Sequence, residues 1–582
     1  MQVIRYPFVV RTDSIEVRKV SIVAWGSLLV TVLVTDKIGT DPVNVGKQLA
    51  ISAFAFSLLP LTLSRRKALF LEQKVALIGI ALFLSATLAS IFLSQSPFER
   101  GFYGAFGRNT GLLTYFSLSI FFIASFQFVK QRSYDKLIGF FFAAGAANIL
   151  LSIASAHGFE VFSWDNPNNF VLGPFGNSNF IGAFMGVSFV VLFVQLLDQR
   201  DNTKILILIL IGLGLTGYVI ILSNALQGVL VAAMGVGLSI FYQLRSVKRF
   251  YLFSYLYLTS LMLGGILMIM GILQRGPLSG ILYKPSVTYR GEYWNAGINM
   301  WLNNPVSGVG IDSYGQFYRS YRSLQSTILP GMGVVTDAAH NVFIDVLAGT
   351  GVFGFIGYIL ILVSVLISAF KFIRKFREFD ATFYSLFLGW LAYQVQSVVS
   401  INQIGLAIWG WVLGGAVIGY SHVRCSGGEL FDKSPNQGGY GNQSRKEKSK
   451  KMSSEATLDP STLVKVLASF VIGLLLALPP FVNDAKVRTF LAGKGTSEDL
   501  VLLLKQWPRD AFQLNRAVVK LAQSDQLLSA RDLAAFATTQ FPNDYSAWFA
   551  LYQISGEGTP EREAFRSKLH KIDPHNPEFF EK

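Results

Sequence analysis

Long apolar runs, separated by short polar connections, fill most of the chain as far as residue 420. A helix that crosses a membrane needs about 20 mostly apolar residues, because its backbone polar groups must be paired internally in lipid. The pattern predicts spans at 20–36, 46–63, 74–94, 109–129, 136–156, 178–197, 204–222, 225–243, 250–273, 343–370, 382–400 and 403–420, with one further span at 462–481. We therefore expect an all-α polytopic membrane protein of about twelve transmembrane helices plus one further span.

The connection at residues 274–340 is the longest between spans, and we expect it to be an external loop. Basic residues favour the cytoplasmic side of a membrane, and a cytoplasmic N-terminus at residues 1–19 would place every basic cluster there. These clusters are Arg65–Lys67, Lys130/Arg132/Lys136, Arg200/Lys204, Arg245/Lys248/Arg249 and Lys371/Arg374/Lys375/Arg377. The first residues are mixed and polar, so the first apolar run is expected to remain as a helix rather than a cleaved signal peptide.

The chain beyond the twelve spans changes character twice. Residues 421–461 are rich in Gly, Ser, Asn and Lys, which predicts a disordered cytoplasmic linker. Residues 482–582 are polar and amphipathic, and we expect an extracytoplasmic α-helical repeat domain there. Three proline turns begin at Trp507, Phe541 and Asp573, at a nearly constant spacing. That spacing is close to the tetratricopeptide period of about 34 residues and predicts two or three degenerate repeats, with a small helical bundle as the alternative.

Composition supports the membrane assignment and narrows the possible ligands. Of the 582 residues, 52% are hydrophobic and 15% are charged, which is unlike a water-soluble domain. The net charge of +15 comes from clusters between spans, so topology explains it better than a nucleic-acid partner does. Cys425 is the single cysteine, and no Cys/His cluster has metal-ligand spacing, so neither an intrachain disulfide nor a metal site is expected.

His340 stands where the long loop re-enters the membrane, ahead of Asn341 and Asp345. An imidazole titrates near neutral pH, and the same loop offers the cations Arg290, Arg319 and Arg322 as anion ligands. A histidine at a helix start could instead serve only as a cap or satisfy a buried carbonyl. The glycines of residues 349–354 permit a kinked or re-entrant backbone beside it.

Arg290 precedes an amphipathic run at 294–302 that ends at Asn303-Asn304-Pro305. A guanidinium on an interfacial helix can bind phosphate through paired donors. The alternative is an arginine that merely anchors the helix at headgroup depth. The following Gly308-Val309-Gly310 predicts a tight turn and is too short for a nucleotide-binding loop.

Taken together, these motifs resemble the O-antigen ligase and polymerase superfamily over roughly residues 20–420. The resemblance lies in Arg290-Gly-Glu-Tyr-Trp-Asn-Ala-Gly, Asn304-Pro-Val-Ser-Gly-Val-Gly310, Ala339-His-Asn-Val-Phe343 and Gly351-Val-Phe-Gly354, preceded by Gly107-Arg-Asn-Thr-Gly-Leu-Leu-Thr-Tyr115 and Gly173-Pro-Phe-Gly-Asn-Ser-Asn-Phe180. Their order around one long loop is more specific than any single motif.

The resemblance implies a metal-independent, inverting glycosyltransferase without a cofactor. It would move a glycan from undecaprenyl pyrophosphate to an acceptor hydroxyl at the outer face of the bacterial inner membrane. His340 would be the catalytic base and Arg290 would hold the pyrophosphate, with Asn341 and Asp345 as supporting residues. The acceptor could be a glycan, a lipid or a protein, so ligase and polymerase stay undivided.

Two departures from the family pattern affect the predicted site. The family often has Ser-Arg-Gly where this chain has Ser223 and then Gln227-Gly228, so Gln227 would take the place of a phosphate-binding arginine. Arg108 or Arg275 would then supply the missing cation. The family also commonly has an acidic residue where Gly349 stands, and Asp345 is the candidate to replace it.

Two further functional classes compete with the transferase. A transporter or flippase for a lipid-linked or small substrate predicts charged residues near the middle of several spans, and few are present. A scaffold that only anchors the repeat domain needs one span rather than a dozen. We expect the C-terminal domain to bind a protein partner or acceptor-handling machinery, since stacked helix pairs present concave surfaces.

Overall fold

The computed structural model describes residues 6–63, 69–159, 161–163, 170–198, 202–426, 459–492, 496–505 and 507–579. Arg65–Lys67, Arg200 and most of the predicted linker, residues 427–458, lie outside this part of the chain. The predicted linker extends over residues 421–461. Residues 421–425 instead complete one helix, and another helix begins at Pro460.

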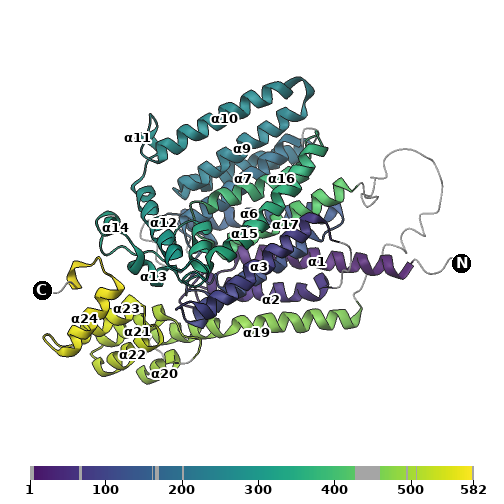
Figure 1. Ribbon diagram of the computed structural model, residues 1–582. Helices are drawn as coiled ribbons and strands as arrows, with labels where there is room; N and C mark the ends of the chain where they lie inside the picture. The colour runs from purple at the N-terminus through teal and green to yellow at the C-terminus, as the bar shows by residue number, and fades with distance from the viewer. Residues whose placement is uncertain are drawn as a thin grey trace, which may run out of the picture.

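All the regular structure in the described residues is helical (Figure 1). The helices as far as Cys425 are α1 (Tyr6–Val32), α2 (Asn44–Leu63), α3 (Leu71–Leu93), α4 (Phe98–Tyr103), α5 (Leu112–Phe126), α6 (Gln131–Ala156), η1 (Gly173–Phe175), α7 (Ser178–Asp198), α8 (Thr203–Leu222), α9 (Leu226–Ser246), η2 (Lys248–Phe250), α10 (Tyr251–Ile272), α11 (Ser279–Leu282), α12 (Pro285–Asn303), α13 (Tyr314–Tyr321), α14 (Leu324–Ser326), η3 (Thr327–Gly331), α15 (Val342–Lys375), α16 (Ala381–Ser397) and α17 (Ile404–Cys425). The last part contains α19 (Pro460–Leu491), α20 (Ser497–Lys505), α21 (Ala511–Gln523), α22 (Leu527–Gln540), α23 (Tyr545–Ile554), α24 (Pro560–Ile572) and η4 (Pro577–Phe579).

Ten helices in the described residues are long and apolar enough to cross a membrane. They are α2, α3, α6, α7, α8, α9, η2 with α10, α15, α17 and α19. The remaining predicted spans coincide with α1, which carries charged residues, and with the shorter helices α5 and α16. The prediction of an all-α polytopic membrane protein with a C-terminal helical region is confirmed.

The first helix begins earlier than the sequence pattern predicts. α1 starts at Tyr6, so residues 6–19, expected to precede the first span, are helical as well. Glu16 and Lys19 are buried in spite of their charge. The Glu16 carboxylate accepts hydrogen bonds from the backbone amides of Val129 and Lys130, at 2.9 and 3.0 Å. Because the turn between α5 and α6 supplies these polar partners, the charged Glu16 can be buried as part of α1.

The connections between helices gather on two opposite faces of the bundle. We call one the loop face, formed by residues 33–43, 94–111, 273–341 and 398–403. On the opposite face, Lys371 pairs with Glu72 and Arg245 donates to the carbonyl of Ile373. The basic clusters that the structure describes thus share one face. The placement of that face in the cytoplasm stays a prediction.

The C-terminal helices lie against the loop face. α19 continues past the predicted end of its span at residue 481 to Leu491 and packs lengthwise on α2, where Gly473 allows close contact with the Ser52 carbonyl. Near its end the buried Asp484 accepts hydrogen bonds from the backbone amides of Thr40 and Asp41, both at 3.0 Å. Helices α20–α24 follow, and α24 packs beside α13 (Figure 1).

Two successive helical hairpins, α21 with α22 and α23 with α24, build most of the C-terminal region. Asp510 and Asp544 occupy equivalent positions in the two hairpins and cap α21 and α23 by accepting from backbone amides of the first turn. The first two proline turns therefore lead into helices as predicted, whereas the third leads only into η4. A separate apolar core, including Leu514, Leu533 and Ala534, lies between these helices.

A buried ion pair joins this region to the long loop. Arg322 of the loop and Asp573, which follows α24, are both fully buried, and Nη2 lies 2.7 Å from Oδ2. Arg319 on α13 lies 2.8 Å from the same carboxylate, and its guanidinium stacks 3.9 Å from the Tyr545 ring. Arg319 and Arg322 therefore bind the C-terminal region to the long loop. This corrects the expectation that they are available as anion ligands.

We expect Asp573→Ala to release the C-terminal helices from the loop face. The substitution leaves the Arg322 charge buried and unpaired, which costs about 3–5 kcal/mol. Cysteines at Gln95 and Asn543, whose amides form a 3.0 Å hydrogen bond across the interface, provide the measurement. In a Cys425→Ser background they should cross-link readily in the parent protein and several-fold more slowly with Asp573→Ala.

The matched control is Glu557→Ala, because this carboxylate is 93% exposed and 4.0 Å from Arg562. Cross-linking should be unchanged in the control. Equal rates in the Asp573→Ala protein would show that this ion pair does not hold the two parts together.

Candidate active site

A break in α15 organises the backbone around the candidate site. Gly351 has φ 68°, within a helix whose other residues are helical, so the ladder of backbone hydrogen bonds is interrupted there. The amides of Val309 and Gly310 donate to the freed carbonyls of Ala348 and Gly349, at 2.9 and 3.1 Å. A Cβ on Gly351 would lie 2.1 Å from the Val306 carbonyl, so only glycine fits. The predicted kink is confirmed, and it fixes the loop to the helix start.

His340 is held in an uncommon backbone conformation just before α15. Its φ of 53° lies in the left-handed region that side chains other than glycine seldom adopt. On one side the Asp345 carboxylate accepts from the amide of Ala339 at 2.7 Å. On the other side Asn341 caps α15 by accepting from the amides of Phe343 and Ile344. These two supporting residues therefore set the direction of the imidazole.

Helix α12 presents Arg290 and Tyr293, one turn apart, to this imidazole. The Tyr293 and His340 rings lie with centroids 5.8 Å apart and planes tilted by 32°. Arg290 is half-buried, and within the described residues its guanidinium has no hydrogen bond or ion pair. Gly297 lets α12 approach α15 closely, since a Cβ there would lie 2.5 Å from Ile344. A guanidinium without a partner among the described residues thus lies close enough to the imidazole to influence its charge.

The pKa values of this pair reflect their surroundings. Burial, and then the positive charge of Arg290, lower the pKa of His340 to about 4, which outweighs the opposing effect of Asp337. Burial also lowers the pKa of Arg290, although a guanidinium remains charged at any physiological pH. The site therefore combines a neutral imidazole with a cation that lacks a counter-ion among the described residues.

Arg108 lies near His340 but is already paired. Its Nε is 3.0 Å from the Asp312 carboxylate, and its Nη1 donates to the carbonyl of Asp337 at 2.7 Å. Burial alone would lower the pKa of Arg108, but the Asp312 carboxylate reverses the direction and raises it. Arg108 therefore holds the segment that leads to His340, and its charge is largely compensated before any phosphate binds.

Gln227 forms its side-chain hydrogen bond with another amide. It is buried at the start of α9, where its Nε2 donates to the Gln396 side chain at 3.0 Å. Across the described part of the chain, no hydrogen bond joins Gln227 to His340, Arg290 or Arg108, and the role of Gln227 in phosphate binding stays a prediction. Arg275, the other candidate cation, is exposed just after α10.

Sequence reasoning missed several residues that shape the site. Tyr293, Asp312 and Asp337 contact or influence His340 and Arg108, yet none belongs to a recognisable catalytic pattern. Two of them carried a signal in the sequence: Tyr293 stands in the motif that begins at Arg290, and Asp312 follows a Gly-rich turn. In the structure Asp312 has φ 56°, a conformation that Asp and Asn tolerate better than most residues. The described residues hold no group of three or more His, Cys, Asp or Glu side chains arranged to bind a metal ion.

Part of the chain is similar to a known protein family. Residues 211–359, which include Arg290, His340 and the break in α15, match the protein family described as O-antigen ligase. Residues 211–359 of this membrane protein are thus similar to an O-antigen ligase domain. No curated protein matches the chain. The matched segment covers the end of α8, α9, α10, the whole long loop and the first half of α15.

We expect histidine NMR to distinguish His340 from the other four histidines. In ¹³C-histidine-labelled protein, with the signal assigned by its loss in His340→Ala, the imidazole should still be neutral at pH 5.5. An ordinary histidine of pKa about 6.5 is mostly protonated there. Because the folded-state pKa is lowered, protonation should begin only as the pH approaches about 4.

Arg290→Leu should raise the pKa of His340, because it removes a neighbouring positive charge. Arg275→Leu, at an exposed arginine, is the matched control and should leave the titration unchanged. A midpoint near pH 6.5 in the parent protein, or no shift with Arg290→Leu, would contradict the placement of these two groups.

Proposed function

We propose that the protein transfers a glycan from an undecaprenyl pyrophosphate carrier to an acceptor hydroxyl. The observation that carries the proposal is a guanidinium without a partner in the described residues, beside a neutral imidazole, on the loop face of an O-antigen ligase domain. The guanidinium suits a pyrophosphate, and the imidazole suits a hydroxyl that must lose its proton.

In this proposal His340 accepts the proton of the acceptor hydroxyl as its oxygen bonds to the anomeric carbon. The bond between that carbon and the pyrophosphate oxygen breaks at the same time, so the configuration inverts. The electron pair of the broken bond leaves with the pyrophosphate, where Arg290 compensates the negative charge. Neither a metal nor a cofactor is required by this scheme, because the pyrophosphate is already a good leaving group.

The electrostatics give donor binding a second role. An imidazole with a pKa of about 4 is neutral but a weak base. A pyrophosphate bound at Arg290 would neutralise the charge that helps to lower this pKa, so the imidazole becomes more basic when the donor is present. Proton removal from the acceptor is then coupled to donor occupancy.

The loop face would be extracytoplasmic in this proposal, because the described basic connections lie on the opposite face. The matching caps of the two helical hairpins support the tetratricopeptide-like interpretation of the C-terminal region, since such repeats recur about every 34 residues. The proposal leaves the acceptor as a glycan, a lipid or a protein.

We expect His340→Ala and Arg290→Ala to abolish product formation in cells and to cause carrier-linked glycan to accumulate. Loss of a general base reduces transfer by about 10²–10⁴-fold, and loss of a charge-stabilising donor by about 10²–10³-fold. Chromatography and mass spectrometry of extracted lipid-linked glycans provide the measurement, and the missing product identifies the acceptor.

Arg132→Ala, at an exposed arginine in the first turn of α6 and expressed at the same level, is the matched control and should leave the product intact. Normal product with either His340→Ala or Arg290→Ala would exclude the proposed roles of those residues.

A further inference from the structure

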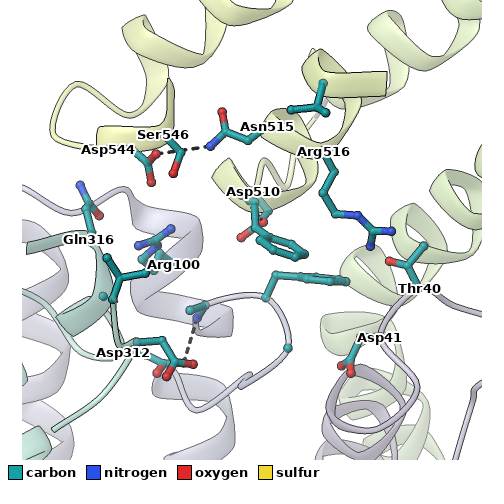
Figure 2. Close-up of a pocket in the computed structure, with 18 of the residues that line it drawn as sticks. Thr40, Asp41, Arg100, Asp312, Gln316, Asp510, Asn515, Arg516, Asp544 and Ser546 are labelled. Atoms are coloured by element: carbon teal, nitrogen blue, oxygen red, sulfur yellow. Dashed lines mark hydrogen bonds between the residues drawn. The ribbon is translucent and has the colours of Figure 1, made fainter. Parts of the chain in front are cut away.

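A large cavity lies between the C-terminal helices and the loop face, outside the His340–Arg290 pair. Its volume is about 970 Å³. Figure 2 shows Arg100, Asp312 and Gln316 on the loop-face side, with Asn515 and Arg516 on the C-terminal helices opposite. Neither part of the chain forms this cavity alone, because both contribute to its wall.

One short stretch of the chain, residues 336–340, runs from the wall of the cavity to the candidate active site. Thr336 and Asp337 line the cavity, and Asp337 comes shortly before His340 in the chain. The Asp337 carbonyl accepts from Arg108, and its exposed carboxylate is close enough to influence the pKa of His340. One wall of the cavity therefore lies close to the imidazole.

Gln316 is a polar group in the wall whose side-chain amide is left unpaired by its neighbours. The residue is 5% exposed, and neither Nε2 nor Oε1 has a hydrogen bond within the described structure. Asn515, across the cavity, donates weakly to Asp544 at 3.4 Å, and its Oδ1 has no hydrogen bond there. Leaving a buried amide unpaired costs about 1–3 kcal/mol, so these groups are suited to a ligand that both donates and accepts.

The remaining lining favours sugar over phosphate or an apolar chain. Phe106 and Phe512 stack across the interface at 6.0 Å, and Phe512 is 54% exposed, which leaves aromatic surface for the apolar face of a sugar ring. The charges are mixed, because Arg100, Arg516 and Lys520 share the lining with carboxylates such as Asp510 and Asp544. Amides, hydroxyls and an aromatic pair together match a hydroxyl-rich chain.

We propose that this cavity binds the glycan chain that is being extended or transferred, with Gln316 and Phe512 as its recognition residues. The inference rests on the proposed glycan transfer and adds a binding site that needs the C-terminal helices. The chain held there comes either from the donor or from the acceptor, and kinetics distinguishes the two.

The test uses the full-length protein in nanodiscs and glycan released by mild acid from the lipid-linked material of His340→Ala cells. Binding of this free glycan should weaken about tenfold or more with Gln316→Leu and with Phe512→Ala. Gln553→Leu, at an exposed amide on α23, is the matched control and should bind like the parent protein. His340→Ala should also bind normally, because His340 does not line the cavity.

Each outcome has a distinct meaning. A raised KM for the lipid-linked donor in the two variants would assign the cavity to the donor glycan, and a raised KM for the acceptor would assign it to the acceptor chain. Unchanged glycan binding in both variants, or no binding by the parent protein, would overturn the inference. Binding without transfer in the parent protein would instead refute the proposed function and leave the cavity as a glycan site.

Discussion

The break in α15 at Gly351 is the constraint on which the candidate site depends. A continuous helix would satisfy its own carbonyls and leave the loop at residues 305–310 without partners. Because the helix opens, the amides of Val309 and Gly310 bond to it, and Val352 donates to Pro305 at 2.9 Å. The end of α12 is thereby fixed beside the start of α15, which places Arg290 and Tyr293 against His340. A local departure from helix geometry thus builds a site from segments that are well separated along the chain.

The charges on the loop face divide into two groups with different physical roles. Arg108, Arg319 and Arg322 are paired with Asp312 or Asp573 and hold parts of the structure together. Arg290 has no such carboxylate among the described residues, and in the proposed function its charge binds the pyrophosphate. The C-terminal region contributes to this difference, because Asp573 forms ion pairs with Arg319 and Arg322. Without Asp573, these two arginines would be available to bind an anion. The C-terminal helices also complete the wall of the cavity near Asp337.

The sequence predicted the features that depend on local pattern. Apolar runs located the spans, proline turns located the caps of α21 and α23, and the glycines near residue 351 indicated the kink. Local pattern alone could not separate Arg290 from Arg319 and Arg322, because their difference comes from Asp573, which lies in the distant C-terminal region. Only the family resemblance singled out Arg290. The early start of α1 could not be predicted either, because the partners of Glu16 are backbone amides at residues 129 and 130, far away in the sequence. The sequence also does not indicate that the Gln227 side chain forms a hydrogen bond with Gln396.

A structure of the full-length protein with undecaprenyl pyrophosphate bound would test the central claim most directly. The account predicts that the pyrophosphate lies on the loop face, with its oxygens within hydrogen-bond distance of the Arg290 guanidinium and the His340 imidazole beside it. A carrier headgroup bound at the opposite face, or on the loop face with Arg290 turned away from it, would contradict the account.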